Sequence, residues 1–318
     1  MDPLFNEPIN PGMKGTLFCE PPKPGTSGTL FECHGHLMMD GSDYTAAKNN
    51  HAGRVCMETV RRELKDLRNA GVVYFRDGGD ALGVGKAARP IAPEYGIEYS
   101  TPVFAIHKKG RYGWIVGRSF ETIGDYRQRL KEVGEENGDF VKLIVSGIIT
   151  FKEYAGLSCP SLEKEEIREL IHIAHEEGYT VMIHVNGPEA IRACVEAGAD
   201  SIEHAYFADE ETLACIAEHK TIWVPTLAAT GAFVGRGGFD EAVAEATVKR
   251  QMEAVRKVSE MCAAAGRTPL IAVGSDSGAV GVPHGNGTVR EYELLAAAGL
   301  CKEEMESANR ELRRRFRR

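Results

Sequence analysis

The amino-acid sequence predicts an α/β fold in which eight parallel strands form a (β/α)8 barrel of the TIM type. From Thr29 onward, short apolar runs alternate with amphipathic stretches, which is the order of elements in a parallel α/β protein. The runs are apolar at nearly every position, as is typical of strands that are covered on both faces. An open, doubly wound sheet is the structural alternative. No Gly-x-Gly-x-x-Gly motif opens a helix after an early strand, so a dinucleotide site is not expected.

Eight runs carry the strand prediction. Most contain β-branched residues and are bounded by Gly, Pro, Asp or Asn. They cover residues 29–34, 72–77, 99–107, 140–147, 180–185, 201–204, 221–225 and 269–276.

The amphipathic stretches between these runs predict helices. Pro188 suits the first turn of one helix, and Asp209 suits the N-cap of another. The expected helices cover residues 162–177, 187–198, 210–219 and 239–265.

Composition narrows the class of protein. Hydrophobic residues make up 43% of the 318 residues and charged residues 26%, which is ordinary for a folded, soluble protein. No apolar run is long enough to span a membrane, and the N-terminus lacks the pattern of a secretory signal. The eight cysteines are scattered and form no Cys-x-x-Cys pair. We therefore expect free thiols and a cytoplasmic location.

The formal net charge is −8, although five of the last six residues are Arg. An acidic body argues against nucleic-acid binding, which needs a basic face. We interpret the arginines as a solvated end of the chain, and we expect a small-molecule partner.

Polar residues follow several predicted strands where functional residues of such barrels gather. His34 and His36 are two apart, so their side chains point the same way from the first strand. His184, His204 and Asp276 end three later strands. Taken alone, each histidine is also explained as a buried, hydrogen-bonded core residue, and Asp276 as the cap of the next helix. Together they predict a metal site, because imidazole and carboxylate are ligands of zinc and similar ions.

Lys142 interrupts the apolar strand at 140–147. Burial of an ammonium group is costly and lowers its pKa toward the neutral amine. A neutral amine reacts with carbon dioxide to give an anionic carbamate, whose two oxygens can bridge two cations. The alternative is a strand-end lysine that extends to solvent.

Several motifs resemble those of the amidohydrolase superfamily, from about residue 28 to 300. The branch they resemble is the binuclear one, of imidazolonepropionase-like and prolidase-like hydrolases. The motifs are HGH (34–36), FVKLIVSG (140–147), HVNG (184–187), AGADSIEH (197–204), GSDSG (274–278) and HGNGTVRE (284–291).

The resemblance implies a role for each residue. His34, His36 and Asp276 would bind one divalent ion, and His184 and His204 a second. Lys142, as N6-carboxylysine, would bridge both, and zinc is the expected metal. A metal-bridged hydroxide would then attack the substrate, with Asp276 as the catalytic proton acceptor.

Other branches of the superfamily remain an alternative. Many deaminases and imidazolonepropionases use one metal ion and place a Glu three residues after the histidine of the fifth strand. Here that position is Gly187. Gly187 and the presence of Lys142 both favour the binuclear hydrolases.

The resemblance implies hydrolysis of an amide or peptide-like C–N bond, with a dipeptide or an N-acyl amino acid as substrate. Carbamates, ureas, lactones and phosphotriesters are alternatives, as is an inactive metal-binding barrel. A cationic stretch after the third strand could hold a substrate carboxylate, or it is a solvated loop. The candidate substrate contacts are His107, Arg111, Tyr112, Tyr154 and His284.

We divide the chain into an irregular N-terminal arm (1–27), a hydrolase barrel (28–304) and a basic C-terminal helix or tail (305–318). Relatives usually carry a small β-sandwich built from both termini. We expect this sandwich to be reduced or absent here. A homo-oligomer that covers the exposed barrel surface is one expected consequence, and marginal stability is the other.

Overall fold

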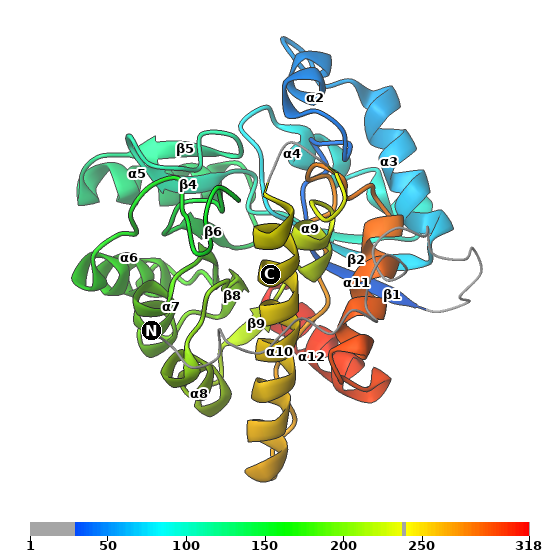
Figure 1. The fold of residues 1–318 in the computed structure, drawn as a ribbon. Helices are drawn as coiled ribbons and strands as arrows, with labels where there is room; N and C mark the ends of the chain where they lie inside the picture. Colours follow the sequence, from blue (N-terminus) through cyan, green and yellow to red (C-terminus); the bar gives the residue numbers. More distant parts are fainter. Residues whose placement is uncertain (1–28, 237–239, 318) are drawn as a thin grey trace.

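Parallel strands form the centre of the structure, and helices pack around them (Figure 1). The computed structural model describes residues 29–236 and 240–317, so the predicted N-terminal arm (1–27) lies outside the described residues. One sheet has the strand order β1 (Leu30–Gly35), β2 (Val72–Asp77), β3 (Glu98–Ser100). The other has the order β5 (Gly117–Phe120), β4 (Ala105–Lys108), β6 (Val141–Ile144), β7 (Val181–Val185), β8 (Ser201–His204), β9 (Ile222–Val224). All neighbouring strands are parallel, which confirms the predicted α/β class.

Residues 270–277 connect the two sheets at the position of the predicted eighth strand. The amide of Ala272 donates to the carbonyl of Trp223 in β9 at 2.9 Å, and the amide of Asp276 donates to the carbonyl of His34 in β1 at 2.8 Å. Isolated parallel bridges join the same segment to both strands. This segment therefore lies between β9 and β1, as the eighth strand of a TIM-type barrel does.

The predicted third strand, over 99–107, is divided in the structure. β3 pairs with β2, whereas β4 pairs with β6. Between them, Val103 has a φ of 68°, a left-handed conformation that redirects the chain. The unpredicted strand β5 pairs with the other edge of β4. It contains Gly117 and Arg118, and only Phe120 in it is buried, so it lacks the apolar run that identifies the other strands.

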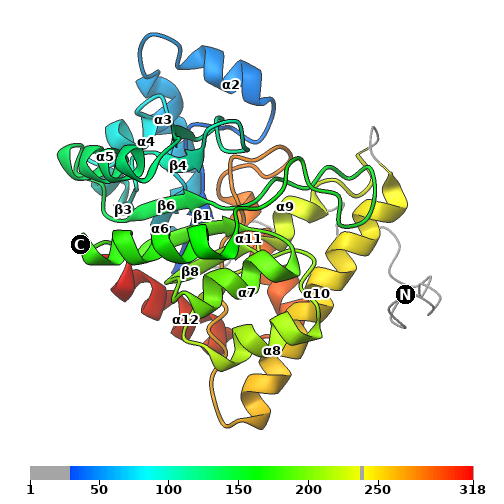
Figure 2. The same ribbon diagram turned by 90° about the vertical axis from the view of Figure 1, so that its left-hand side faces the viewer.

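Amphipathic helices cover the sheets, and α6 (Lys164–Glu176), α7 (Pro188–Glu196) and α8 (Glu210–Glu218) lie side by side outside them (Figures 1 and 2). Pro188 occupies the first turn of α7, and the Asp209 carboxylate accepts a hydrogen bond from the Thr212 amide at the start of α8. The four helices predicted from the sequence are confirmed. The helices are α2 (Tyr44–Asn50), α3 (Met57–Asn69), α4 (Val84–Ala88), α5 (Ile123–Glu135), α6 (Lys164–Glu176), α7 (Pro188–Glu196), α8 (Glu210–Glu218), α9 (Leu227–Gly231), α10 (Glu241–Ala264), α11 (Asn286–Ala297) and α12 (Lys302–Arg315), with a short 3-10 helix η3 (Ala92–Tyr95).

The C-terminal helix α12 packs against the barrel, so the expectation of a solvated end is wrong. Leu312 and Phe316 are fully buried with Tyr74, Phe140 and Ile222, near the starts of three strands. The helix is amphipathic, because its apolar residues recur at helical spacing while the arginines occupy other positions. α12 therefore covers the end of the barrel opposite the carboxyl ends of the strands.

We expect Phe316→Ala to lower the free energy of unfolding by about 3–5 kcal/mol, the range for removing a fully buried aromatic ring. The Phe316 ring contacts Phe140 edge to face, with ring centroids 5.2 Å apart, and the Arg76 guanidinium lies 4.4 Å from the Phe316 centroid. Urea denaturation measures the change. Arg314→Ala is the control, because the Arg314 side chain is 71% exposed. Equal stability of both variants would contradict the packing described here.

Candidate metal centre

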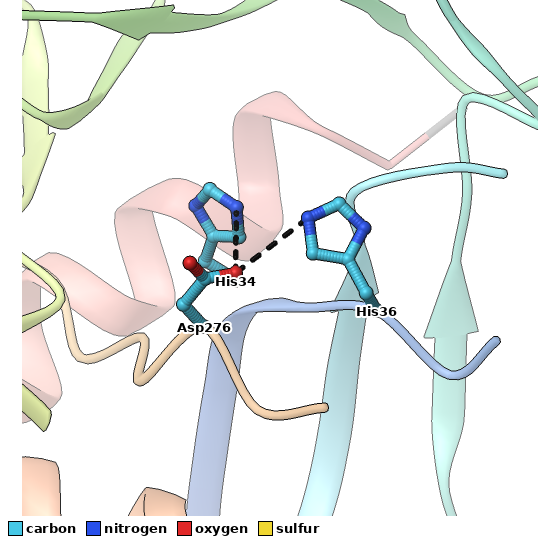
Figure 3. Close-up of side chains that lie close together, drawn as sticks. All are labelled: His34, His36 and Asp276. Carbon is cyan, nitrogen blue, oxygen red and sulfur yellow. Dashed lines mark ion pairs between the residues drawn. The ribbon is translucent and has the colours of Figure 1, made fainter. Parts of the chain in front are cut away.

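His34, His36 and Asp276 meet where β1 ends beside residues 270–277 (Figure 3). The Nε2 atoms of His34 and His36 lie 3.7 Å and 3.6 Å from the same oxygen, Oδ1 of Asp276. One potential ligand atom from each residue lies within 4.8 Å of the other two. His34 lies in β1 and His36 directly follows it, and residues two apart in an extended chain point to the same side.

The other predicted ligands lie beside this trio. His184 comes from β7 and His204 from the end of β8, and their ring centroids are 4.7 Å apart. The His204 centroid is 4.9 Å from that of His34, and β6 supplies Lys142. The structure therefore brings six predicted residues to one cavity of about 280 Å³: His34, His36, Lys142, His184, His204 and Asp276.

Burial keeps the imidazoles of this cluster neutral. It lowers the pKa of His36 and of His184 to about 3, and the charge of Lys142 acts in the same direction. The pKa of each of the other two imidazoles is also well below its ordinary value. Burial raises the pKa of Asp276 to about 6, against the opposing effect of Lys142. A neutral imidazole has a lone pair available for a cation, so the cluster is chemically suited to bind metal.

Lys142 is 1% exposed, and its Nζ atom has no hydrogen-bond partner among the described residues. The alternative of a lysine that extends to solvent is therefore wrong. Burial lowers the pKa of Lys142 to about 8, despite the nearby Glu203 carboxylate. Buried polar atoms are nearly always hydrogen-bonded, so the isolated Nζ indicates a group in the cavity that the protein atoms alone do not supply.

A buried ion pair behind the cluster orients His34. Glu203 Oε2 lies 2.7 Å from His34 Nδ1, and the Arg76 guanidinium donates to both Glu203 oxygens at 2.8 Å and 3.0 Å. Ser201 also donates to Glu203. The sequence pattern assigns no role to Glu203, because its partners His34 and Arg76 lie 169 and 127 residues away.

We expect Glu203→Gln to weaken zinc binding about 10–100-fold, because a carboxylate behind a ligating imidazole fixes the ring and raises its basicity. The free energy of unfolding should also fall, by about 3–5 kcal/mol, because Arg76 would lose its buried charge partner. Zinc titration with a competing chelator and urea denaturation measure the two effects. Glu211→Gln, at a side chain that is 79% exposed, should change neither.

Backbone conformation also positions the ligands. His204 and Asp276 have φ values of 66° and 60°, and such conformations persist only where the surroundings impose them. The His204 carbonyl accepts hydrogen bonds from Trp223 Nε1 at 3.0 Å and Gln251 Nε2 at 2.5 Å. His204 Nδ1 lies 2.7 Å from the Thr226 hydroxyl oxygen. These contacts hold the imidazole over the cavity.

A second buried carboxylate, Glu32, fixes the segment that carries Asp276. Glu32 accepts hydrogen bonds from the Ser275 amide at 2.8 Å, from the Ser275 hydroxyl at 2.5 Å and from the Thr288 hydroxyl at 2.6 Å. It also accepts from the His34 amide at 3.1 Å. Glu32 precedes His34 by two residues, the same alternation that predicted the His34–His36 pair, but a lone Glu in an apolar strand does not indicate which partners it has.

Of the five candidate substrate contacts, only Tyr112 lines the cavity, with its ring centroid 5.2 Å from that of His184. His107 Nδ1 lies against the Lys108 carbonyl, and Arg111 donates to the Pro160 carbonyl. Tyr154 lines a separate, smaller hollow. His284 Nε2 lies 2.8 Å from the Met39 carbonyl oxygen, so it supports the loop after β1. The structure does not bring these four to the cavity.

None of the helices in residues 29–236 and 240–317 combines the length and the apolar character needed to cross a membrane.

Comparison with known sequences finds a family match over most of the chain. The amidohydrolase family matches over residues 29–306. An uncharacterized protein of Mycobacterium tuberculosis is 30% identical over 183 residues, which are 55% of this chain and 46% of that protein. Ochratoxinase of Aspergillus niger is 23% identical over 276 residues, 78% of this chain and 57% of that enzyme. The chain thus spans about half the length of the curated relatives it matches.

Solved structures share the fold. A Xaa-Pro dipeptidase with methionine in its active site superposes with a TM-score of 0.68 and 19% identity, over 90% of this chain and 75% of that chain. The A. niger ochratoxinase structure gives a TM-score of 0.68 and 18% identity, over 91% and 71%. These likenesses confirm the predicted fold class.

Proposed function

The chain belongs to the amidohydrolase family, and on that premise we propose that it hydrolyses an amide C–N bond of a small molecule with the help of bound divalent metal ions. One observation carries the proposal: four neutral imidazoles, a carboxylate and a buried lysine converge on one cavity, and the lysine has no hydrogen-bond partner in residues 29–236 and 240–317. Binding pockets with convergent polar groups of shifted pKa are the sites where catalysis is expected.

The residues fit a pair of metal ions. His34, His36 and Asp276 would hold one ion, and His184 and His204 would hold the other. Lys142 would serve both as a carbamate, formed when its neutral amine adds to carbon dioxide and releases a proton. The Lys142 Nζ atom, which has no hydrogen-bond partner among the described residues, supports this assignment, because carboxylation would replace the buried amine by an anionic group whose oxygens could bind the ions. Zinc is the metal we propose, since imidazole-rich sites suit it.

Bound divalent ions would polarise the substrate carbonyl and lower the pKa of a water molecule. Asp276 would accept the proton of the attacking water and transfer it to the leaving nitrogen. The C–N bond breaks, the oxygen of water becomes part of the carboxylic acid product, and the nitrogen leaves as an amine. Glu203 would keep His34 oriented, and Glu32 would hold the segment that carries Asp276.

The family resemblance and the cationic stretch after the predicted third strand both favour a dipeptide or an N-acyl amino acid. In the structure, Lys108 pairs with Glu166, and Lys109 pairs with Glu121 at 3.0 Å. These contacts do not support recognition of a substrate carboxylate by this stretch. We therefore propose that the substrate is an amide and that it does not need to carry a free carboxylate.

Metal analysis of the purified chain, followed by a metal-supplemented assay against a library of small amides, tests the proposal. The library should also hold carbamates, ureas, lactones and phosphotriesters, since the same chemistry can attack all of them. We expect about two divalent ions per chain and release of amine from at least one amide. Metal binding without hydrolysis of any compound would favour a binding protein, and absence of metal would overturn the proposal.

A further inference from the structure

We propose that the substrate group filling the cavity is neutral and apolar, an aryl or branched alkyl group, and that a carboxylate at this position is disfavoured. The inference rests on the proposed function and names the substrate class of the same site. Its evidence is the cavity wall around the metal-ligand cluster, and this wall has no part in the proposed function. The cluster consists of His34, His36, Lys142, His184, His204 and Asp276.

The cavity wall beyond the ligand cluster is predominantly apolar. Its apolar side chains come from the loop after β1, the loop after β4, the loop after β6, the segment after α9 and the loop after residues 270–277. Representatives are Met39, Ile115, Ile148, Phe151, Phe233 and Val280. Because these segments are far apart in sequence, the apolar wall is a property of the whole rim and not of a single loop.

The hydrogen-bonding groups of three polar wall residues are engaged within the protein. Tyr206 donates from its hydroxyl to the Thr226 carbonyl at 2.8 Å, and Thr230 donates to the Leu227 carbonyl at 3.2 Å. Asn186 donates to Gly147 O at 3.2 Å, and its side-chain oxygen accepts from the Tyr206 amide. These groups are therefore poorly placed to solvate a carboxylate.

Among the described residues that line the cavity, Lys142 is the only cation, and it lies with the ligand cluster. Lys108 and Lys109 are paired with Glu166 and Glu121. Lys48 lies over the Trp114 ring at 5.9 Å, outside the cavity lining. At the apolar wall, away from the candidate metal ligands, a carboxylate would lose water without gaining a charge partner from the lining side chains, which is unfavourable.

Cavity size supports a compact apolar group. The volume is about 280 Å³, whereas an apolar cavity of roughly 150 Å³ accommodates benzene. One ring with a short substituent and the amide group therefore match the space. Ile148, at 43% exposure, stands at the solvent side of the wall, so a substitution there alters the entrance with little risk to folding.

Three compounds with one skeleton test the inference on the zinc-loaded chain: N-acetylphenethylamine, N-acetyl-L-phenylalaninamide and N-acetyl-L-phenylalanine. The second and third have nearly the same size and differ in charge. We measure kcat/KM from amine release and, independently of turnover, affinity by calorimetry. The two neutral compounds should exceed the acid about 10-fold or more, the expected effect of a buried group left without a partner.

A pair of variants tests the cause. Ile148→Lys places an ammonium at the entrance and should raise the acid-to-amide ratio about 5-fold or more, whereas Ile148→Met, of similar length and neutral, should leave that ratio unchanged. An acid that binds as well as or better than its amide overturns the inference, as does failure of both neutral compounds to bind at millimolar concentration. Tighter binding of the neutral compounds without turnover of any amide would sink the proposed function and leave this inference standing.

Discussion

Lys142→Met is expected to lower the rate of amide hydrolysis strongly, reduce the bound zinc to less than one ion per chain, and yet stabilise the metal-free fold. Met has a similar length and no charge. In the metal-free protein it removes a buried polar atom that has no hydrogen-bond partner in the part of the chain that the structure describes, so the free energy of unfolding in EDTA should rise by about 1–3 kcal/mol. In the presence of zinc the order should reverse, because ligand binding to the folded state stabilises it and the variant loses that contribution.

Thermal denaturation with and without EDTA, metal analysis and amine release together measure this effect. The rate should fall about 10³-fold, because the bound metal ions would contribute several kcal/mol of transition-state stabilisation. Lys131→Met is the matched control, because the Lys131 side chain is 67% exposed. A Lys142→Met protein with the zinc content and rate of the parent would show that Lys142 does not serve the metal ions.

The convergence of the candidate metal ligands could be predicted from the sequence because each of them lies in a predicted strand or directly after one. Periodicity fixes which way a strand side chain points, and parallel strands in a barrel all end at the same rim. His34, His36, His184, His204 and Asp276 therefore follow from the strand pattern alone. The same pattern indicates a special role for Lys142, because a lysine in a strand that is buried on both faces is rare unless it has a partner.

The contacts behind the cluster and the cavity wall could not be predicted in this way. Glu203 meets Arg76 and His34 across 127 and 169 residues of sequence, and local periodicity carries no information on such pairings. The ion pairs of the cationic stretch after the predicted third strand could not be predicted for the same reason. Lys108 lies against Glu166, 58 residues away. The buried face of α12, which ends in Phe316, also could not be predicted, because arginines surround its few apolar residues in the sequence.

Asp276→Asn is expected to lower kcat about 10³–10⁴-fold, near the upper end of what general acid–base catalysis contributes. Asparagine keeps the shape and one ligand oxygen, so the left-handed backbone at this position, with a φ of 60°, should be retained. It cannot accept the proton of the attacking water. Because the remaining ligands are unchanged, zinc content should stay above one ion per chain while the rate falls, which separates the proton role from the ligand role.

Steady-state amine release, metal analysis and circular dichroism of the same preparation make the comparison. Asp66→Asn, at an exposed position on α3, is the matched control and should retain the parent rate. If Asp276→Asn hydrolyses amides as fast as the parent, the proton acceptor is another group. If instead it loses rate and zinc in proportion, Asp276 acts only as a ligand. A fall in kcat at retained zinc content is the result that assigns the proton transfer to its carboxylate.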